Sequence, residues 1–236
     1  MAQDLHKRYG DREVVRGVSL DVHDKEIVGL LGPNGAGKTT SFYMIIGIQK
    51  PSAGSVYLNG ADIVGWPLHE RARHGLSYLP QESSVFRRLS VMDNLRIIFE
   101  YTGLSKAKQK QKAEQLLEEF SIAHLRHSLA SHLSGGERRR LEIARSLIRE
   151  PQFILLDEPF AGIDPLAVDD IQGLIKDLRE RNIGVLISDH NVRETLRICD
   201  RAYLMHEGQV IVHGTPDDLI NDSKARRVYL GEAFQM

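Results

Sequence analysis

The sequence predicts an α/β fold in which a sheet-containing core is interrupted by a helical lobe. Three observations support this prediction. Apolar runs of strand length alternate with helical patterns in approximately residues 1–83 and again in 151–236. Between them, approximately residues 84–150 contain capped helical stretches. A glycine-rich segment, Gly32–Thr39, joins an early apolar run to a helix, as ligand-binding loops of such folds do.

Length and composition fit this fold and exclude several function classes. The 236 residues, 42% of them hydrophobic, are enough for one domain with an inserted lobe. The charges nearly cancel, 31 basic against 32 acidic, so no overall attraction to nucleic acid or anionic lipid is expected. The single cysteine, Cys199, rules out an intrachain disulfide and is typical of a reducing compartment.

Neither a secretory signal nor a membrane span is expected. The start, Met1–Asp11, is polar and charged, unlike a signal peptide. The longest apolar runs have the length of strands, whereas a membrane-spanning helix needs about 20 apolar residues. We therefore expect a soluble chain that could still dock on a membrane protein.

The first part of the chain should contain mainly strands. The glycine-rich loop follows one short apolar run, and a helix then begins that should stop near Gly47 and Pro51. The expected strands are Val14–Val22, Glu26–Leu31, Ser55–Leu58 and Leu76–Leu79, and the expected helix is Thr40–Ile48.

Serine caps mark the helices of the middle part. Ser90 is followed three residues later by Asp93, and Ser134 by Glu137, the spacing of a helix N-terminus. The charged run after Ser105 predicts a solvated helix face. The expected helices are Val91–Tyr101, Lys106–Phe120 and Arg138–Arg149.

After Pro151 the alternation of strands and helices returns. The turn around Glu207-Gly208 predicts a hairpin. The expected strands are Phe153–Leu156, Val185–Ser188, Ala202–Met205 and Val210–Val212, and the helices are Val168–Glu180 and Val192–Ile198.

The segment Gly32–Thr39 reads GPNGAGKT, the pattern of a P-loop that binds ATP. Its glycines allow backbone N–H groups to turn towards phosphates at a helix N-terminus. Lys38 would reach the β- and γ-phosphates, and the Thr39 hydroxyl would ligate Mg²⁺. An ordinary glycine-rich turn would not need both Lys38 and Thr39 at these positions after the glycines. The candidate nucleotide-binding residues here are Gly32, Pro33, Asn34, Gly35, Ala36, Gly37, Lys38, Thr39 and Thr40.

Two carboxylates follow the apolar run Phe153–Leu156, where ligands of parallel sheets bind. Asp157 suits Mg²⁺, and Glu158 could polarise the attacking water. Many buried strands end in an acid, so the pattern is specific only because a P-loop precedes it.

The segment Leu133–Glu137 reads LSGGE and predicts a second anion site. Ser134 and Glu137 form a capping box, while Gly135 and Gly136 would expose N–H groups at a helix start. A merely well-capped helix would leave the glycine pair unexplained, since glycine is costly in a first turn.

LSGGE between a P-loop and LLDEP is highly specific, and on these motifs the whole chain resembles the ATP-binding subunits of ABC transporters. The resemblance implies a single domain over residues 1–236. Its core would be of the RecA-like P-loop NTPase type, with an antiparallel β subdomain and an inserted α-helical subdomain. It also implies ATP hydrolysis with Mg²⁺ as cofactor.

Further residues match family landmarks. The resemblance makes Gln81 a residue that senses Mg²⁺ and contacts the transmembrane partner, and His190 a switch that contacts the γ-phosphate. Asp164 matches a loop across the dimer, and Tyr9 the aromatic that stacks on adenine. Alone, each of these could be an ordinary loop or packing residue.

The resemblance also implies a homodimer. In the family, each ATP lies between the P-loop of one subunit and the LSGGE of the other. Ser134, Gly135 and Gly136 would therefore bind ATP held by a second copy.

Longer stretches, Tyr78–Asn94, Asp189–Thr195 and Ala225–Gly231, are most similar to the lipopolysaccharide-export ATPases of Gram-negative bacteria. This implies a homodimer on the cytoplasmic face of the inner membrane, attached to two transmembrane subunits. Phe86, Arg87 and Arg88 would lie in the docking groove, or else pack within the helical lobe. The abrupt start before Leu5 predicts a shortened first strand.

Three alternatives remain open. Branched-chain amino acid importer ATPases fit these stretches less well. ATPases acting on nucleic acid or ribosomes carry insertions or a second ATPase half that this chain lacks, and Arg138–Arg140 is more simply a solvated helix face. A regulatory subunit without turnover would typically have lost Glu158 or His190, and both are present.

Overall fold

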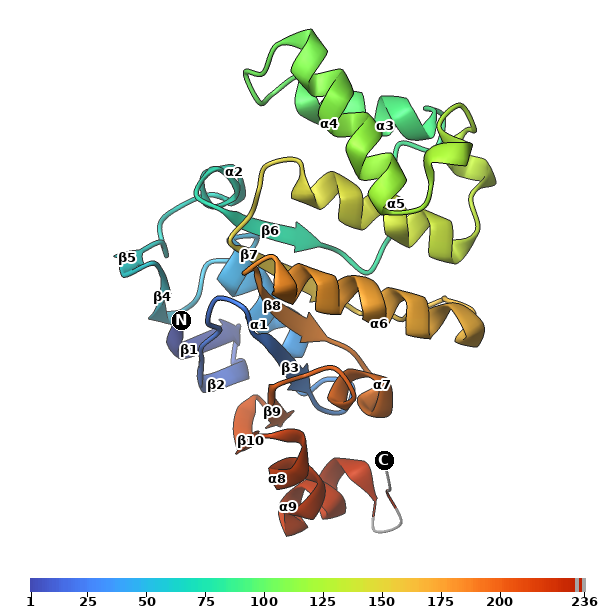
Figure 1. The fold of residues 1–236 in the computed structure, drawn as a ribbon. Helices are drawn as coiled ribbons and strands as arrows, with labels where there is room; N and C mark the ends of the chain where they lie inside the picture. Colours follow the sequence, from blue (N-terminus) through green and yellow to red (C-terminus); the bar gives the residue numbers. More distant parts are fainter. Residues whose placement is uncertain (232–233, 235–236) are drawn as a thin grey trace.

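The computed structural model describes residues 1–231 and 234, apart from the side chains of residues 165 and 166. A six-stranded sheet, in the order β10-β9-β3-β8-β7-β6, forms its centre (Figure 1). All neighbouring strands from β9 to β6 are parallel, and only β10 pairs antiparallel. The strands are β3 (Ile27–Leu31), β6 (Leu76–Leu79), β7 (Phe153–Asp157), β8 (Gly184–Ser188), β9 (Arg201–His206) and β10 (Gln209–Gly214).

A second, antiparallel sheet has the order β2-β1-β4-β5. Its strands are β1 (Ala2–Tyr9), β2 (Arg12–Leu20), β4 (Ala53–Leu58) and β5 (Ala61–Asp62). The first strand has eight residues where we expected an abrupt start, because only Ala2 and Leu5 need to be buried while its polar residues stay outside.

Each face of the central sheet has its own core, as strand alternation requires. Ile154 and Leu156 of β7 pack with α6 (Pro165–Glu180), whereas Leu155 between them packs with α1 (Lys38–Ile46). The latter core also receives Leu5 and Val18 of the antiparallel sheet. The helices α7 (Val192–Leu196), α8 (Pro216–Asn221), α9 (Ser223–Ala225) and the π-helical turn Arg226–Leu230 complete the C-terminal part.

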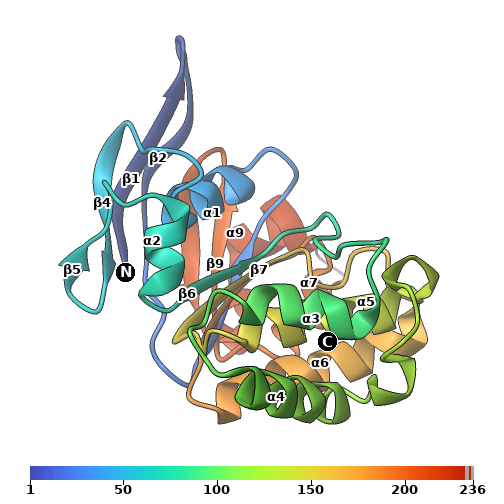
Figure 2. The same ribbon diagram turned by 90° about the horizontal axis from the view of Figure 1, so that it is seen from above.

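A helical lobe occupies the opposite side of β6 and β7 from the antiparallel sheet (Figures 1 and 2). It consists of α3 (Val91–Phe99), α4 (Lys106–Glu119), α5 (Gly135–Leu147) and the 3₁₀ turns Ala123–Leu125 and Ala130–His132. The predicted caps are confirmed: the hydroxyls of Ser90, Ser105 and Ser134 each accept an N–H three residues on. The last helix starts at Gly135, before the predicted Arg138, because its glycines are themselves helical.

The helix α2 (Leu68–Arg73) was not predicted, and it carries an unexpectedly buried arginine. Arg71 is only 1% exposed and donates to the carbonyls of Met44, 2.9 Å, and Ile45, 2.5 Å, in the last turn of α1. It also donates to the carbonyls of Trp66, 2.9 Å, and Val64, 3.2 Å. Burial lowers the pKa of Arg71 to about 10. Its guanidinium therefore satisfies carbonyls that the end of α1 leaves without helical partners.

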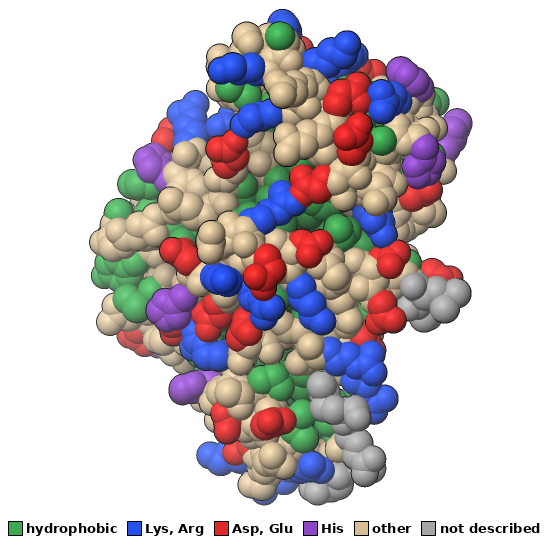
Figure 3. Space-filling view, in the orientation of Figure 1, with side chains coloured by type: hydrophobic (Ala, Val, Ile, Leu, Met, Phe, Trp, Pro, Cys, Tyr) green, Lys and Arg blue, Asp and Glu red, His purple; other side chains and the backbone are tan. Residues whose placement is uncertain are grey.

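Figure 3 shows acidic and basic side chains interspersed over the face of Figure 1, in keeping with the near-zero net charge. None of the helices within the described part of the chain is long and apolar enough to cross a bilayer.

Candidate active site

The parallel pairing brings the predicted motifs to one edge of the central sheet. Asp157 at the end of β7 is the register partner of Ser188 at the end of β8, and Ser188 is also paired with Leu30 of β3. The loop 32–37 continues from β3. The loop 32–37, the Asp157-Glu158 pair and the segment after Ser188 therefore follow the carboxyl ends of adjacent strands. Open α/β sheets bind their ligands at these ends.

The loop 32–37 requires glycine at defined positions. Gly32 has φ +146°, and a Cβ there would lie 2.2 Å from the Met205 carbonyl oxygen. Gly37 has φ +101°, and its Cβ would lie 2.9 Å from the Val14 carbonyl oxygen. Helix α1 begins directly after it at Lys38, so its positive dipole end faces this loop. The segment has the geometry of an anion-binding turn.

Lys38 is 7% exposed and lies inside the curve of this loop. Its ammonium donates to the carbonyls of Gly32, 2.6 Å, and Pro33, 3.0 Å. Burial lowers the pKa of Lys38, whereas the nearby carboxylates, Glu158 first, act in the opposite direction. Thr39, the predicted metal ligand, is exposed at the start of the helix.

Asp157 is buried and accepts a 3.4 Å hydrogen bond from the Tyr78 hydroxyl. Burial, followed by repulsion from Glu158, raises the pKa of Asp157 to about 6. A buried carboxylate beside a second one suits a divalent cation. The described residues contain no cluster of three His, Cys, Asp or Glu that could hold a metal. Asp157 and the Thr39 hydroxyl could hold a magnesium ion here together with phosphate oxygens and water, the ligands that Mg²⁺ sites commonly use.

Glu158 is the meeting point of three loops. Its Oε2 accepts from Gln81 Nε2 at 2.8 Å and lies 3.3 Å from His190 Nδ1. These partners follow β6 and β8, so residues far apart in sequence converge on one carboxylate. Glu158 has φ +46°, and its N–H donates to the Ser188 carbonyl at 2.6 Å. This left-handed conformation is costly for a glutamate, so the surrounding structure must hold the backbone here.

Asp189 belongs to this site although sequence reasoning missed it. It is fully buried and accepts N–H groups from Phe160, 3.1 Å, and Asn191, 2.7 Å. Burial raises the pKa of this carboxyl. It joins the loops after β7 and β8 and lies 3.5 Å from His190 Nδ1. The available signal was its position immediately after an apolar strand, as for Asp157.

The LSGGE residues form the start of helix α5. Ser134 caps α5, accepting from the Glu137 N–H at 3.3 Å while the Glu137 carboxylate accepts from the Ser134 N–H at 2.8 Å. A Cβ on Gly135 would be 3.1 Å from the Gly162 carbonyl oxygen, which places this helix start beside the loop before α6. Asp164 is exposed in that loop. The predicted second anion site thus lies at the start of α5, beside the loop before α6.

Tyr9 lies at the end of β1 and is 48% exposed. Its hydroxyl donates to Gln49, and the Lys7 ammonium lies 5.2 Å from the ring centroid. A half-exposed ring is compatible with stacking on a base, and the adenine contact stays a prediction.

The predicted docking residues are exposed on the segment between β6 and α3. Phe86 is 44% exposed, with the Arg145 guanidinium 5.0 Å from its ring centroid, and Arg87 and Arg88 are also exposed. A fully buried asparagine, Asn94, which sequence reasoning missed, holds this segment. It accepts from the Phe86 N–H at 2.8 Å and donates to the Phe86 carbonyl at 3.1 Å.

The expectation that Arg138–Arg140 forms a solvated face is wrong for its central member. Arg139 is 6% exposed and pairs with the buried Glu142 at 3.1 Å. Arg140 pairs with Asp170 at 2.8 Å instead. The helical register turns Arg139 inward, towards the segment that follows β6.

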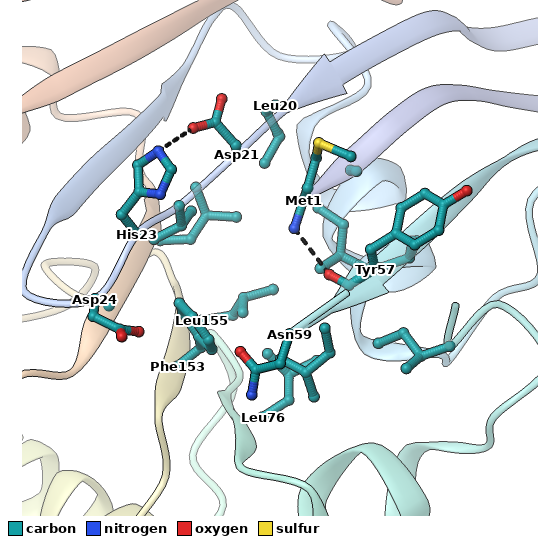
Figure 4. A pocket seen from close by; sticks show the side chains of 18 of the residues that line it. Met1, Leu20, Asp21, His23, Asp24, Tyr57, Asn59, Leu76, Phe153 and Leu155 are labelled. Carbon is teal, nitrogen blue, oxygen red and sulfur yellow. Dashed lines mark hydrogen bonds and ion pairs between the residues drawn. The ribbon is translucent and has the colours of Figure 1, made fainter. Parts of the chain in front are cut away.

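A cavity of about 790 Å³ lies at the other edge of the central sheet (Figure 4). Its lining includes Phe153 and Gly184, the first residues of β7 and β8, and His23 ahead of β3. It therefore lies at the amino ends of the parallel strands, whereas the candidate active-site residues follow their carboxyl ends.

Comparisons with known proteins point to one family. Residues 15–161 match the model of the ABC transporter family. The chain is 56% identical over 236 residues to the lipopolysaccharide export system ATP-binding protein LptB of Escherichia coli (strain K12), and 54% identical to that of Haemophilus influenzae. Each alignment covers all of this chain and 98% of the relative.

Solved structures show the same fold. An ATP-binding cassette of an ABC transporter in its ADP conformation superimposes with a TM-score of 0.87 at 29% identity, covering 98% of both chains. A nucleotide-free cassette gives the same TM-score and identity. The cbiO1 protein of Clostridium perfringens, part of an ABC transporter complex, gives 0.86 at 28% identity, covering 96% of this chain and 92% of its own.

Proposed function

The chain belongs to the ABC transporter family of ATP-binding proteins, and from this premise we propose that it powers the export of lipopolysaccharide. Membership makes it an ATP-hydrolysing subunit that works with membrane permease components. Relatives that it matches over 98% of their length are named for lipopolysaccharide export, and this supports the choice of cargo.

The observation that carries the catalytic part of the proposal is the convergence of Gln81 and His190 on Glu158. Lys38 would bind the β- and γ-phosphates of ATP with the N–H groups of its loop. Glu158 would accept a proton from the attacking water, and His190 and Gln81 would orient the carboxylate and the γ-phosphate. Bound at Asp157 and Thr39, Mg²⁺ would neutralise charge on the phosphate oxygens.

The position of the LSGGE helix start is compatible with a homodimer. It lies beside the loop before α6, and in a homodimer this end of a second copy would complete each ATP site. Ser134, Gly135 and Gly136 would face the γ-phosphate bound to the partner, with Asp164 near the dimer interface. Hydrolysis would remove this bridge, and the helical lobe of residues 84–150 would then move relative to the core.

Docking would use the segment between β6 and α3. An exposed aromatic ring beside Arg87 and Arg88 has the composition of an interface anchor. The same segment contains Gln81, so contact with membrane subunits would reach Glu158 directly. In this arrangement the chain lies on the cytoplasmic face of the inner membrane.

The cargo is tested by reconstitution. We expect the tagged chain to co-purify two membrane subunits from a Gram-negative host, and vesicles containing this complex to release lipopolysaccharide only with ATP and Mg²⁺. The complex with Glu158→Gln serves as the control. ATP-dependent hydrolysis without any movement of lipopolysaccharide would refute the cargo while leaving the ATPase assignment intact.

Replacing Phe86 with alanine should weaken docking. Truncating an aromatic anchor typically costs about 2 kcal/mol, or about 30-fold in affinity. The yield of membrane subunits on the tagged variant should therefore fall, while the isolated chain still binds ATP. Tyr101→Ala is the control, since Tyr101 is 72% exposed in the helical lobe but outside the proposed surface. Equal yields from the two variants would contradict the docking assignment.

A further inference from the structure

Helix α5 turns one row of charged side chains towards the segment that follows β6. Arg139, Glu142 and Arg145 are spaced three apart, so they lie along one side of the helix. Arg139 and Glu142 are 6% and 4% exposed and form an ion pair of 3.1 Å. The same helix starts with Ser134 and the two glycines of LSGGE.

This pair holds the chain on both sides of Gln81. Arg139 Nη1 donates to the Pro80 carbonyl at 3.2 Å, immediately before Gln81. Glu142 Oε1 accepts from the Ser83 hydroxyl and from the Ser84 N–H, both at 2.9 Å. Gln81 itself has an exposed side chain and reaches out to Glu158. The backbone around Gln81 is therefore fixed by the helix, and the side chain is left to contact the catalytic carboxylate.

Arg145 adds contacts between the same helix and Phe86, the proposed docking residue. It donates to the Ser84 carbonyl at 2.6 Å, and its guanidinium lies over the Phe86 ring. One helix thus contacts residues 80, 83, 84 and 86 from a single side. Any displacement of Phe86 must move α5 or break these contacts.

Stability does not account for the buried pair. Within the described part of the chain, Arg139 Nε and Nη2 are buried and find no hydrogen-bond partner. A buried ion pair with unsatisfied donors is commonly no more stable than apolar side chains of similar volume. Its contribution is better explained by the geometry that it imposes on the loop.

We propose that Arg139 and Glu142 are positioning residues: the buried pair sets Gln81 against Glu158 and joins this contact to the LSGGE helix. The inference rests on the proposed roles of Gln81 and Glu158. It adds that two binding events act on the same rigid element, α5. One is contact of Ser134 with ATP bound to a partner chain, and the other is docking of a membrane subunit at Phe86. Both would therefore affect the contact between Gln81 and Glu158.

The test replaces both partners, Arg139→Met with Glu142→Met, so that no charge stays buried alone. In the purified full chain we expect kcat for ATP to fall by about 10- to 100-fold, because a displaced catalytic contact costs that much. KM for ATP should change little, since the loop 32–39 is untouched. Amide hydrogen exchange should show the Ser84 N–H losing protection.

A double-mutant cycle with Gln81→Ala separates positioning from general damage. If the pair acts through Gln81, the double methionine change should have little further effect on kcat in the Gln81→Ala background. Ser83→Ala provides a milder change that leaves the ion pair in place. It should lower kcat about fivefold, as expected for one lost hydrogen bond, with the same non-additivity.

Arg96→Gln is the matched control, because Arg96 forms an exposed ion pair of the same spacing with Asp93, 3.3 Å, in the same lobe. It should leave kcat unchanged. Multiplicative losses in the cycle, or a retained kcat despite lost protection at Ser84, would overturn the inference. A wild-type chain that hydrolyses no ATP would instead refute the proposed function on which the inference rests.

Discussion

Replacing Glu158 with glutamine is expected to lower steady-state ATP hydrolysis by about 10²- to 10⁴-fold, the usual contribution of a general base. Glutamine has nearly the same shape, and its amide oxygen can still accept from Gln81 Nε2, which lies 2.8 Å from Glu158 Oε2. It cannot accept a proton from water. The loss should therefore appear in kcat, while ATP binding through the loop 32–39 is retained.

Retained ATP without hydrolysis has a second consequence. If ATP bridges two copies, the Glu158→Gln chain should accumulate as an ATP-dependent dimer, measured by light scattering with and without nucleotide. The rate of ATP hydrolysis is measured by phosphate release. Lys38→Met is the second control, since this variant is expected to lose ATP binding itself.

Glu150→Gln is the matched control for the backbone. Glu150 has φ +51°, similar to that of Glu158, but it is exposed and pairs with Lys112. Undiminished phosphate release by Glu158→Gln would exclude this residue as the base. An equal loss in Glu150→Gln would show that the effect does not depend on the position of the carboxylate in the site.

The motifs of the candidate site can be recognised from the sequence because their signals are local. The loop 32–39, the Asp157-Glu158 pair and the Ser134 cap each depend on neighbours within a few positions, so residue type and spacing are sufficient to recognise them. The family resemblance gave Gln81 and His190 separate roles, and their convergence on Glu158 was not predicted, since these residues lie on three separate loops.

The supporting residues were not predictable for a different reason. Glu142 contacts Ser83 across 59 positions, and Arg71 contacts Met44 across 27. Charged side chains are mostly exposed, so a sequence pattern assigns them to the surface unless a partner is known. Asn94 and Asp189 were missed because polar side chains, too, are mostly exposed. The first strand is longer than expected, because among its polar residues only two positions are buried.

Among the buried charged residues, Arg71 is expected to have the largest effect on stability. Arg71→Met should lower the free energy of unfolding by about 3–5 kcal/mol, the range for losing one partner of a buried charged network. Methionine fills much of the volume but donates nothing, so the Met44 and Ile45 carbonyls at the end of α1 lose their hydrogen bonds. For a chain of this length, a loss of that size corresponds to about 6–20 °C in Tm.

Arg73→Met separates this effect from the general loss of an arginine. Arg73 lies on the same helix, but it is exposed and forms a 2.7 Å ion pair with Glu70, which contributes about 0–1 kcal/mol. Urea unfolding should give equal slopes for both variants and a lower midpoint only for Arg71→Met. Similar midpoints would show that the carbonyls of α1 find other donors. A larger loss at Arg71 would instead identify α2 as the element that holds the end of α1, and with it the helix on which Lys38 and Thr39 stand.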